Sequence, residues 1–188
     1  MEKQSRRCRD ASFAGMKFDP LKNHRLLVID DNRAVHDDFR KILITASTLP
    51  NDLAADEAAL FGETAEKFRA PLFEIDSAYQ GDEGLEMIER SLLEGRPYAL
   101  AFVDVRMPPG WDGIETTCKI WEKYPDLRVV ICTAYADYSW EEILQKLGYS
   151  ERIIILKKPF ESIEVLQLAA AMTEQWRLNQ KAKLRMGD

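Results

Sequence analysis

Short apolar runs alternate with longer segments of helical period along most of this chain, and this alternation restricts the fold more than any other feature. The runs have the length of strands and lie near residues 25–29, 72–76, 98–103, 127–132 and 152–156. The intervening segments, near 33–46, 81–94, 113–123 and 138–147, and a last one from about 161, carry apolar residues at helical spacing. Strands alternating with helices predict βαβ units and a parallel sheet covered on both faces.

The second apolar run differs from the other four. It alternates apolar and polar residues over Leu72-Phe-Glu-Ile-Asp76, as an edge strand does, whereas the others are nearly continuous apolar runs. We therefore expect an α/β fold with a doubly wound five-stranded parallel sheet in the flavodoxin-like order 2-1-3-4-5, whose second strand lies at an edge.

Polar residues follow four of these runs at the point where each run ends. They are Asp30 and Asp31, Asp104, Thr133 and Lys158. Because the carboxyl ends of parallel strands meet at one edge of the sheet, these side chains should converge there. Three carboxylates, a hydroxyl and an ammonium indicate a divalent-metal site beside a nucleophilic carboxylate, with groups that hold a phosphoryl oxygen. The chemistry expected is phosphoryl transfer to Asp104.

The same residues resemble the receiver domain of two-component response regulators. The resemblance runs from about Arg25 into the helix after Phe160, and it depends on Asp30-Asp31, Asp104-Val-Arg-Met-Pro-Pro-Gly-Trp-Asp-Gly113, Thr133-Ala134 and Lys158-Pro159-Phe160. Each of these motifs alone is common. Together, in this order and each at a strand end, they identify a CheY-like receiver.

The resemblance implies a role for each residue of the set. Asp104 would be the phospho-acceptor, Lys158 would contact the phosphoryl group, and Thr133 would hydrogen-bond one of its oxygens. Mg²⁺ would be bound by Asp31, Asp104 and the main-chain carbonyl of Arg106, with Asp30 acting directly or through water. The family also has a cis bond before the proline that follows this lysine, and Lys158-Pro159 is able to adopt one.

Some positions depart from what is usual in the family. Ile155 stands where many receivers have an aromatic residue whose rotation accompanies switching, so that mechanism is not expected here. The loop after Asp104 is one residue longer than the common form and has Trp111 at its tip. Arg106 and Tyr135 are bulky residues at positions that screen the phosphoryl group from water. His36, one turn into the first predicted helix, is expected at the surface.

Other classes of protein fit the sequence less well. A haloacid-dehalogenase-like phosphatase would need an acid at position 106, and a flavin or dinucleotide protein would need a phosphate-binding loop where Asp30-Asp-Asn-Arg33 stands. The remaining alternative is a pseudo-receiver, which keeps the fold as a protein-interaction module and is not phosphorylated.

Composition sets the outer limits of these interpretations. The net charge of −6 does not favour a nucleic-acid surface, and no apolar stretch is long enough to span a membrane. The three cysteines lack metal-ligand spacing, and with no secretory segment they favour reduced thiols and a cytoplasmic location. Cys132 is expected to be a small core residue.

We expect a receiver domain over residues 24–172 with three additions. They are an N-terminal extension over 1–23 without a fixed fold, an insertion over 47–70 whose composition favours a helix or a mobile excursion, and a C-terminal helical extension or linker over 173–188. The last predicted helix has no proline or glycine between residues 161 and 186, so at 1.5 Å per residue it could exceed ~30 Å, longer than a small sheet needs, and should project. Ile163, Leu166, Ala170, Thr173 and Trp176 follow a helical spacing that fades toward the end of the helix.

The partners implied by the resemblance are a histidine kinase or a phosphotransfer protein. The chain would be a regulatory phospho-acceptor and not a classical enzyme. A fused output domain in a larger signalling protein, with this chain as its N-terminal receiver, is expected, with a stand-alone receiver as the alternative, and self-association as a homodimer is left open. No partner nucleic acid or membrane is expected.

Overall fold

The structure is a computed structural model, and it describes residues 19–48, 71–134, 138–148 and 150–186. Five parallel strands form one sheet: β1 (Arg25–Ile29), β2 (Glu74–Ala78), β3 (Leu100–Asp104), β4 (Arg128–Thr133) and β5 (Ile153–Lys157). Their spatial order is β2-β1-β3-β4-β5, which confirms the predicted flavodoxin-like topology and the edge position of the second strand.

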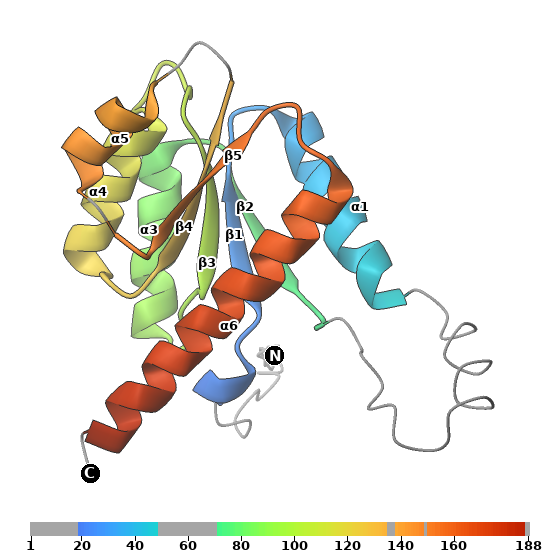
Figure 1. Cartoon of the computed structure of the whole chain (residues 1–188), viewed down its shortest axis with the longest axis vertical. Helices are drawn as coiled ribbons and strands as arrows, with labels where there is room; N and C mark the ends of the chain where they lie inside the picture. Colours follow the sequence, from blue (N-terminus) through green and yellow to red (C-terminus); the bar gives the residue numbers. More distant parts are fainter. Residues whose placement is uncertain (1–18, 49–70, 135–137, 149, 187–188) are drawn as a thin grey trace, which may run out of the picture.

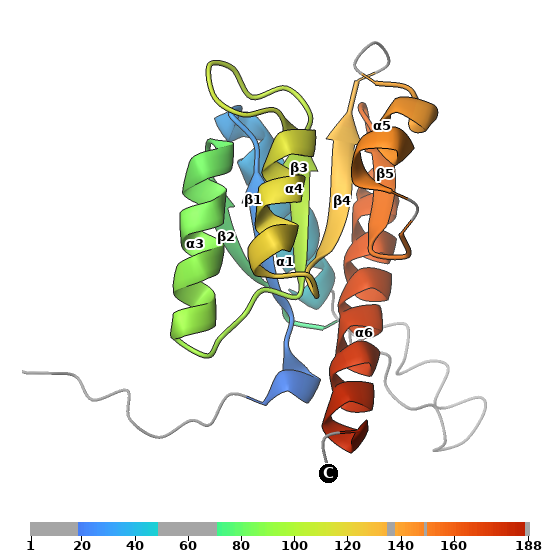
Figure 2. The ribbon, with the colours of Figure 1, turned by 90° about the vertical axis from the view of Figure 1, so that its left-hand side faces the viewer.

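Helices cover both faces of the sheet. α3 (Gly81–Leu93), α4 (Gly113–Lys123) and α5 (Trp140–Leu147) lie on one face, and α1 (Arg33–Thr48) and α6 (Ser162–Met186) lie on the other (Figures 1 and 2). A short 3₁₀ helix, η1 (Pro20–Lys22), precedes β1 and contacts α6. Among the described residues, no helix is both long enough and apolar enough to cross a membrane.

Alternate residues of each central strand supply the two cores. In β1, Leu27 and Ile29 face α3 and α4, whereas Leu26 and Val28 face α1 and α6. β1, β3 and β4 are buried on both faces, and this requirement explains why they are continuous apolar runs. Cys132 lies in the core on the α1 and α6 side, as predicted.

The edge strand β2 starts two residues later than the sequence predicted. Its pairing with β1 begins where Glu74 lies opposite Arg25, and the Arg25 guanidinium donates to Asp76 at 2.9 Å. Leu72, which the apolar pattern placed in the strand, is 77% exposed. Polar contacts to β1 therefore fix the register of this strand, since its outer side has no neighbouring strand.

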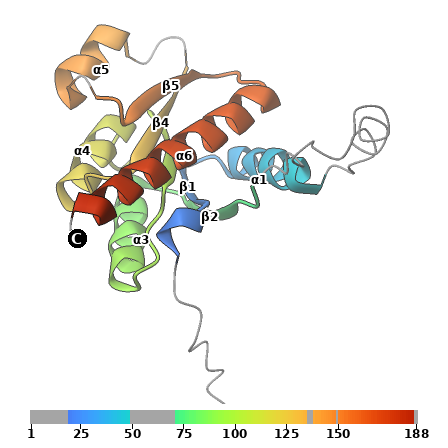
Figure 3. The same ribbon diagram turned by 60° about the horizontal axis from the view of Figure 1, so that its bottom comes forward.

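α6 is the longest helix, with 25 residues, and it runs across the sheet and beyond its lower edge (Figures 1 and 3). The predicted apolar stripe was wrong in its first members: Ile163 is 54% exposed, and the buried positions are Val165, Ala169 and Met172. The prediction chose a face about one residue out of register. Thr173 and Trp176 are buried as well, so the contacts of α6 with the domain continue past residue 172.

The far end of α6 is attached to the loop between α4 and β4. The Trp176 indole donates to the Tyr124 hydroxyl at 2.8 Å. One turn further on, Gln180 and Lys183 donate to the Asp126 carboxylate at 3.1 and 2.6 Å. The part of the helix that was expected to project therefore packs on the domain as far as Lys183. The N-terminal residues 1–18, and the predicted insertion apart from the end of α1 at Thr48, lie outside the described residues.

Candidate phosphoryl-acceptor site

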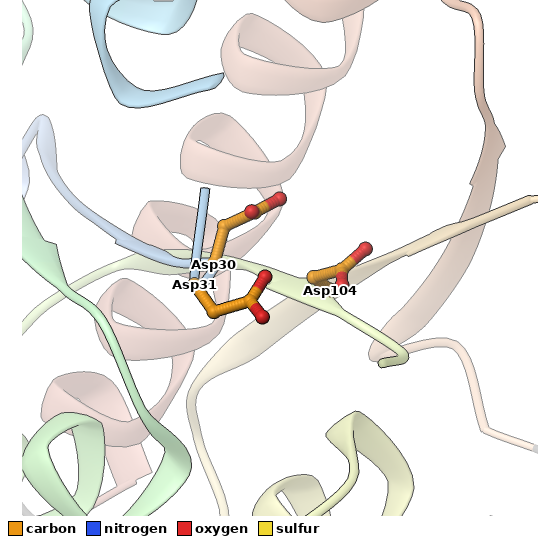
Figure 4. A group of neighbouring side chains, drawn as sticks. All are labelled: Asp30, Asp31 and Asp104. Atoms are coloured by element: carbon orange, nitrogen blue, oxygen red, sulfur yellow. The ribbon is translucent and has the colours of Figure 1, made fainter. Parts of the chain in front are cut away.

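Three carboxylates meet at the carboxyl edge of the sheet. Asp30 and Asp31 follow β1, and Asp104 is the last residue of the neighbouring strand β3. One oxygen from each lies within 4.8 Å of the others, and Figure 4 shows the three side chains converging from the two strand ends. Asp30 and Asp104 are 2% and 9% exposed, whereas Asp31 is exposed. Two carboxylates therefore form the floor of the site and the third lies at its mouth.

The turn after β1 is held by hydrogen bonds of its own polar residues. The Asp30 carboxylate accepts from the Asn32 amide at 2.8 Å, and the Asn32 side chain accepts from the Ala34 amide at the start of α1. The Asp30 amide donates to the Ala78 carbonyl at the end of β2. These short-range bonds are typical of Asp and Asn at turns, and they present the two acids at the strand end.

Lys158 supplies the positive charge of the site. Its ammonium donates to the Asp30 carboxylate at 2.8 Å and to the Asp104 carboxylate at 2.6 Å. The residue directly follows β5, its amide donates to the Thr133 carbonyl at 2.8 Å, and the Lys158–Pro159 peptide bond is cis, as the resemblance implied. The neighbouring Lys157 is exposed. One ammonium thus joins the ends of β1 and β3 to the end of β5.

Burial and unequal charge shift the ionisation of this cluster. Burial raises the pKa of the Asp104 carboxyl, and the charge of Asp30 adds to that rise, while the hydrogen bond from Lys158 opposes it. Burial acts to lower the pKa of Lys158, but its hydrogen bonds to Asp104 and Asp30 outweigh this and raise it. Three carboxylates against one ammonium leave a formal excess of two negative charges, a balance typical of an acidic triad that can hold a divalent cation.

The loop after Asp104 closes tightly on the end of β3. The Arg106 amide donates to the second carboxylate oxygen of Asp104 at 3.1 Å, and the Gly113 amide donates to the Val105 carbonyl at 2.9 Å. A Cβ atom at Gly113 would clash with the main chain of Asp104, so only glycine allows α4 to begin this close to the strand. Asp112 caps α4 by accepting from the Glu115 amide. The binding role expected of the Arg106 carbonyl stays a prediction.

Thr133 ends β4 beside this cluster and is 4% exposed. Its hydroxyl donates to the Ala134 carbonyl at 3.0 Å. A contact of this hydroxyl with a phosphoryl oxygen remains a prediction. Ile155 is half-buried and packs against the core on the α3 to α5 side, and Tyr135 lies outside the described residues.

The expectation that His36 lies at the surface was wrong. Its ring is 1% exposed, and its Nε2 atom lies 2.7 Å from the carbonyl oxygen of Asp30. The signal that could have located it is helical spacing, because His36, Phe39 and Leu43 share the inner face of α1 and all three are buried. The polarity of histidine had favoured the opposite prediction.

Comparison with known proteins agrees with this geometry. A family model described as the response regulator receiver domain matches residues 53–170, a range that includes Asp104, Thr133 and Lys158 but begins after Asp30 and Asp31. The photosynthetic apparatus regulatory protein RegA of Cereibacter sphaeroides is 28% identical over 137 residues, which cover 69% of this chain and 70% of RegA. The oxygen regulatory protein NreC of Staphylococcus epidermidis is 33% identical over 81 residues, 43% of this chain and 36% of NreC.

Solved structures show the same fold at lower sequence identity. A CheY-like receiver domain protein from Methanospirillum hungatei is 21% identical, with a TM-score of 0.55, and the match covers 82% of this chain and 97% of that one. A structure described as adenylate cyclase from Rhodopirellula baltica is 19% identical, with a TM-score of 0.63, and the match covers 88% and 98% of the two chains.

Proposed function

The chain belongs to the response regulator receiver domains of two-component signal transduction, and from this premise we propose that it accepts a phosphoryl group on Asp104 and switches an output. Receiver domains are regulatory domains and generally partner histidine kinases. We propose that the donor here is a phosphohistidine of a histidine kinase or of a phosphotransfer protein.

The observation that carries the proposal is the position of Lys158 between Asp30 and Asp104, at 2.8 and 2.6 Å. A compact ammonium beside a buried carboxylate lowers the electrostatic cost of bringing an anionic donor to that carboxylate. An ordinary surface acid would not need a partly buried cation shared with a second acid.

The donor set fits Mg²⁺. The residues that would hold it are Asp30, Asp31 and Asp104, whose oxygens lie within 4.8 Å of one another, together with the Arg106 main-chain carbonyl. These are hard oxygen ligands, and their two uncompensated negative charges match a divalent ion. When bound, Mg²⁺ would neutralise the carboxylates and stabilise charge on the phosphoryl oxygens.

The proposed reaction gives each residue of the site a task. A carboxylate oxygen of Asp104 forms a bond to phosphorus while the bond from phosphorus to the donor imidazole nitrogen breaks, which leaves an acyl phosphate on Asp104 and a free imidazole. Lys158 compensates negative charge on the transferred group, and the Thr133 hydroxyl turns from the Ala134 carbonyl to donate to one of the phosphoryl oxygens. The Arg106 amide already donates to Asp104 and holds the acceptor carboxylate in one orientation.

Mass spectrometry of the intact chain after incubation with acetyl phosphate and Mg²⁺ would test this proposal. We expect the wild type to gain one phosphoryl group and Asp104→Asn to gain none. Mg²⁺ should increase the phosphorylation of Asp31→Ala only weakly, because this variant loses an exposed ligand of the cation. Asp126→Asn is the matched control, since it makes the same change at the opposite end of the sheet, and it should be modified as the wild type is.

Equal modification of the wild type and Asp104→Asn would contradict the acceptor assignment. A wild type that gains nothing from acetyl phosphate or from a phosphorylated kinase would instead favour the pseudo-receiver. We further propose that residues 24–172 form the body of the receiver and that α6 continues past residue 172, as far as Met186, as a helical extension that packs on it. A nucleic-acid or membrane partner is not part of this proposal.

A further inference from the structure

His36 is a buried polar residue for which phosphoryl transfer gives no direct task. It lies on the inner face of α1, 1% exposed, and among the described residues neither ring nitrogen hydrogen-bonds a carboxylate of the cluster. Its Nε2 atom lies 2.7 Å from the main-chain carbonyl oxygen of Asp30. Because a carbonyl oxygen only accepts hydrogen bonds, Nε2 must carry the proton and donate it.

That carbonyl belongs to the peptide plane that joins Asp30 to Asp31. A peptide unit is planar, so a hydrogen bond to its oxygen fixes the orientation of the whole plane and therefore the direction in which the chain enters Asp31. The preceding plane is held too, because the Asp30 amide donates to the Ala78 carbonyl at 3.1 Å. Both peptide planes that flank Asp30 are thus anchored, one by β2 and one by His36.

The imidazole is itself held in place by its surroundings. Its ring packs on the Tyr79 ring with centroids 4.7 Å apart, and the Arg33 guanidinium lies 5.1 Å from the Tyr79 centroid. Tyr79 directly follows Ala78, the residue that accepts from the Asp30 amide. The contacts therefore form a closed circuit from Asp30 through His36, Tyr79 and Ala78 back to Asp30.

The other ring nitrogen adds a second observation. Nδ1 is buried and has no hydrogen-bond partner among the residues that the structure describes. Burying an imidazole with one nitrogen unpaired is unfavourable, and a phenylalanine would fill the inner face of α1 without that cost. Packing alone therefore does not account for a histidine at this position, whereas a directed donor does.

We infer that His36 is a positioning residue of the acceptor site, which orients Asp31 for the cation by holding the Asp30 carbonyl. The inference rests on the proposed function, because it concerns the same metal and phosphoryl site. His36 is not one of the residues proposed to hold the cation or the phosphoryl group, so its effect should appear in how well the site binds Mg²⁺.

Two substitutions separate the hydrogen bond from the packing. His36→Phe keeps an aromatic ring beside Tyr79 and removes the donor, whereas His36→Gln keeps an N–H donor of similar reach and removes the ring. Calorimetric titration would give the Mg²⁺ dissociation constant of each variant, and thermal unfolding would give its stability. We expect His36→Phe to bind Mg²⁺ about three- to tenfold more weakly, the equivalent of one neutral hydrogen bond. The Mg²⁺ affinity of His36→Gln should stay within about twofold of the wild type, less than the loss of one whole hydrogen bond, even where its melting temperature falls.

The inference is overturned if His36→Phe binds Mg²⁺ as the wild type does, or if both variants lose affinity in step with their stability. Should His36→Phe not fold, the wild type still provides a test, because nitrogen NMR of the imidazole must show the proton on Nε2, and a proton on Nδ1 alone would overturn it. A wild type that binds Mg²⁺ but takes no phosphoryl group would refute the proposed function and leave the role of His36 in cation binding standing.

Discussion

Replacing Trp176 with alanine should destabilise the whole domain, although this residue lies beyond the predicted receiver boundary at 172. The ring is 1% exposed, and its indole nitrogen donates to the Tyr124 hydroxyl at 2.8 Å. A buried tryptophan removes roughly 200 Å² from water, which at ~25 cal/mol per Å² corresponds to about 5 kcal/mol. This figure is an upper bound because the unfolded chain already buries part of the ring. We expect a loss of about 4 kcal/mol, within the usual range for large-to-small core substitutions.

The hydrogen bond and the ring can be separated by a smaller change. Trp176→Phe keeps an aromatic ring but leaves the buried Tyr124 hydroxyl without its donor, and it should cost about 1–2 kcal/mol. Leu178→Ala is the control on the same helix, because Leu178 is 50% exposed, and it should change stability by no more than about 0.5 kcal/mol.

Urea unfolding followed by circular dichroism is the suitable assay, because Trp176 would itself contribute to a fluorescence signal. The free energy of unfolding would be compared among the wild type and the three variants, with the denaturant slope checked for constancy. A loss below about 1 kcal/mol for Trp176→Ala would refute the reasoning, since it would mean that this end of α6 does not pack on the domain in solution.

Two further predictions concern the ends of the sheet. Burial acts to raise the pKa of Asp126, but hydrogen bonds from Lys183 and Gln180 outweigh burial and lower the pKa. The ionised carboxylate should therefore add to the free energy of unfolding above the unfolded pKa of about 3.9, and this stabilisation should be lost as the pH falls through the folded pKa. Asp126→Asn should therefore be about 1 kcal/mol less stable than the wild type at pH 7. Thermal unfolding should show this difference in stability shrinking as the solution is made acidic, and a difference that does not change with pH would contradict the prediction. Gly113→Ala should cost roughly 1–3 kcal/mol and slow phosphorylation, because the new Cβ would meet the Asp104 main chain, and unchanged melting and phosphorylation rates would show that the loop yields freely.

The sheet and the clustering of the site residues at its edge could largely be predicted from sequence, because the apolar runs and the polar residues that follow them meet at the strand ends. A polar residue directly after a continuous apolar run, such as Asp104, or one position further on, such as Lys158, marks both the end of a buried strand and the edge of the sheet where sites form. The alternating run before Asp76 also identified the edge strand.

The predictions that were wrong concern places where two arrangements of the chain satisfy the same sequence pattern. α6 has adjacent apolar residues at Val165 and Leu166, so two neighbouring faces offer helical stripes, and only the shape of the sheet selects one of them. At the edge strand, Leu72 extends the apolar run, but ion pairs with Arg25 set the register. His36 was misplaced because its polarity outweighed its helical spacing with Phe39 and Leu43, and its hydrogen-bond partner, a main-chain carbonyl, leaves no trace in the sequence.

The placement of Lys158 has a consequence for how an anion would enter the site. An ammonium carries three N–H donors, and among the described residues two of them are engaged, one by Asp30 and one by Asp104. The third donor can meet an oxygen of an incoming phosphoryl group, before any bond to Asp104 forms, while the Asp30 and Asp104 carboxylates keep the other two. A bound phosphoryl group would then accept a third hydrogen bond from the Lys158 ammonium, which already links the ends of β1 and β3 to the end of β5. Binding of the anion would therefore strengthen the contacts among these three strand ends, and neither existing hydrogen bond would have to break first.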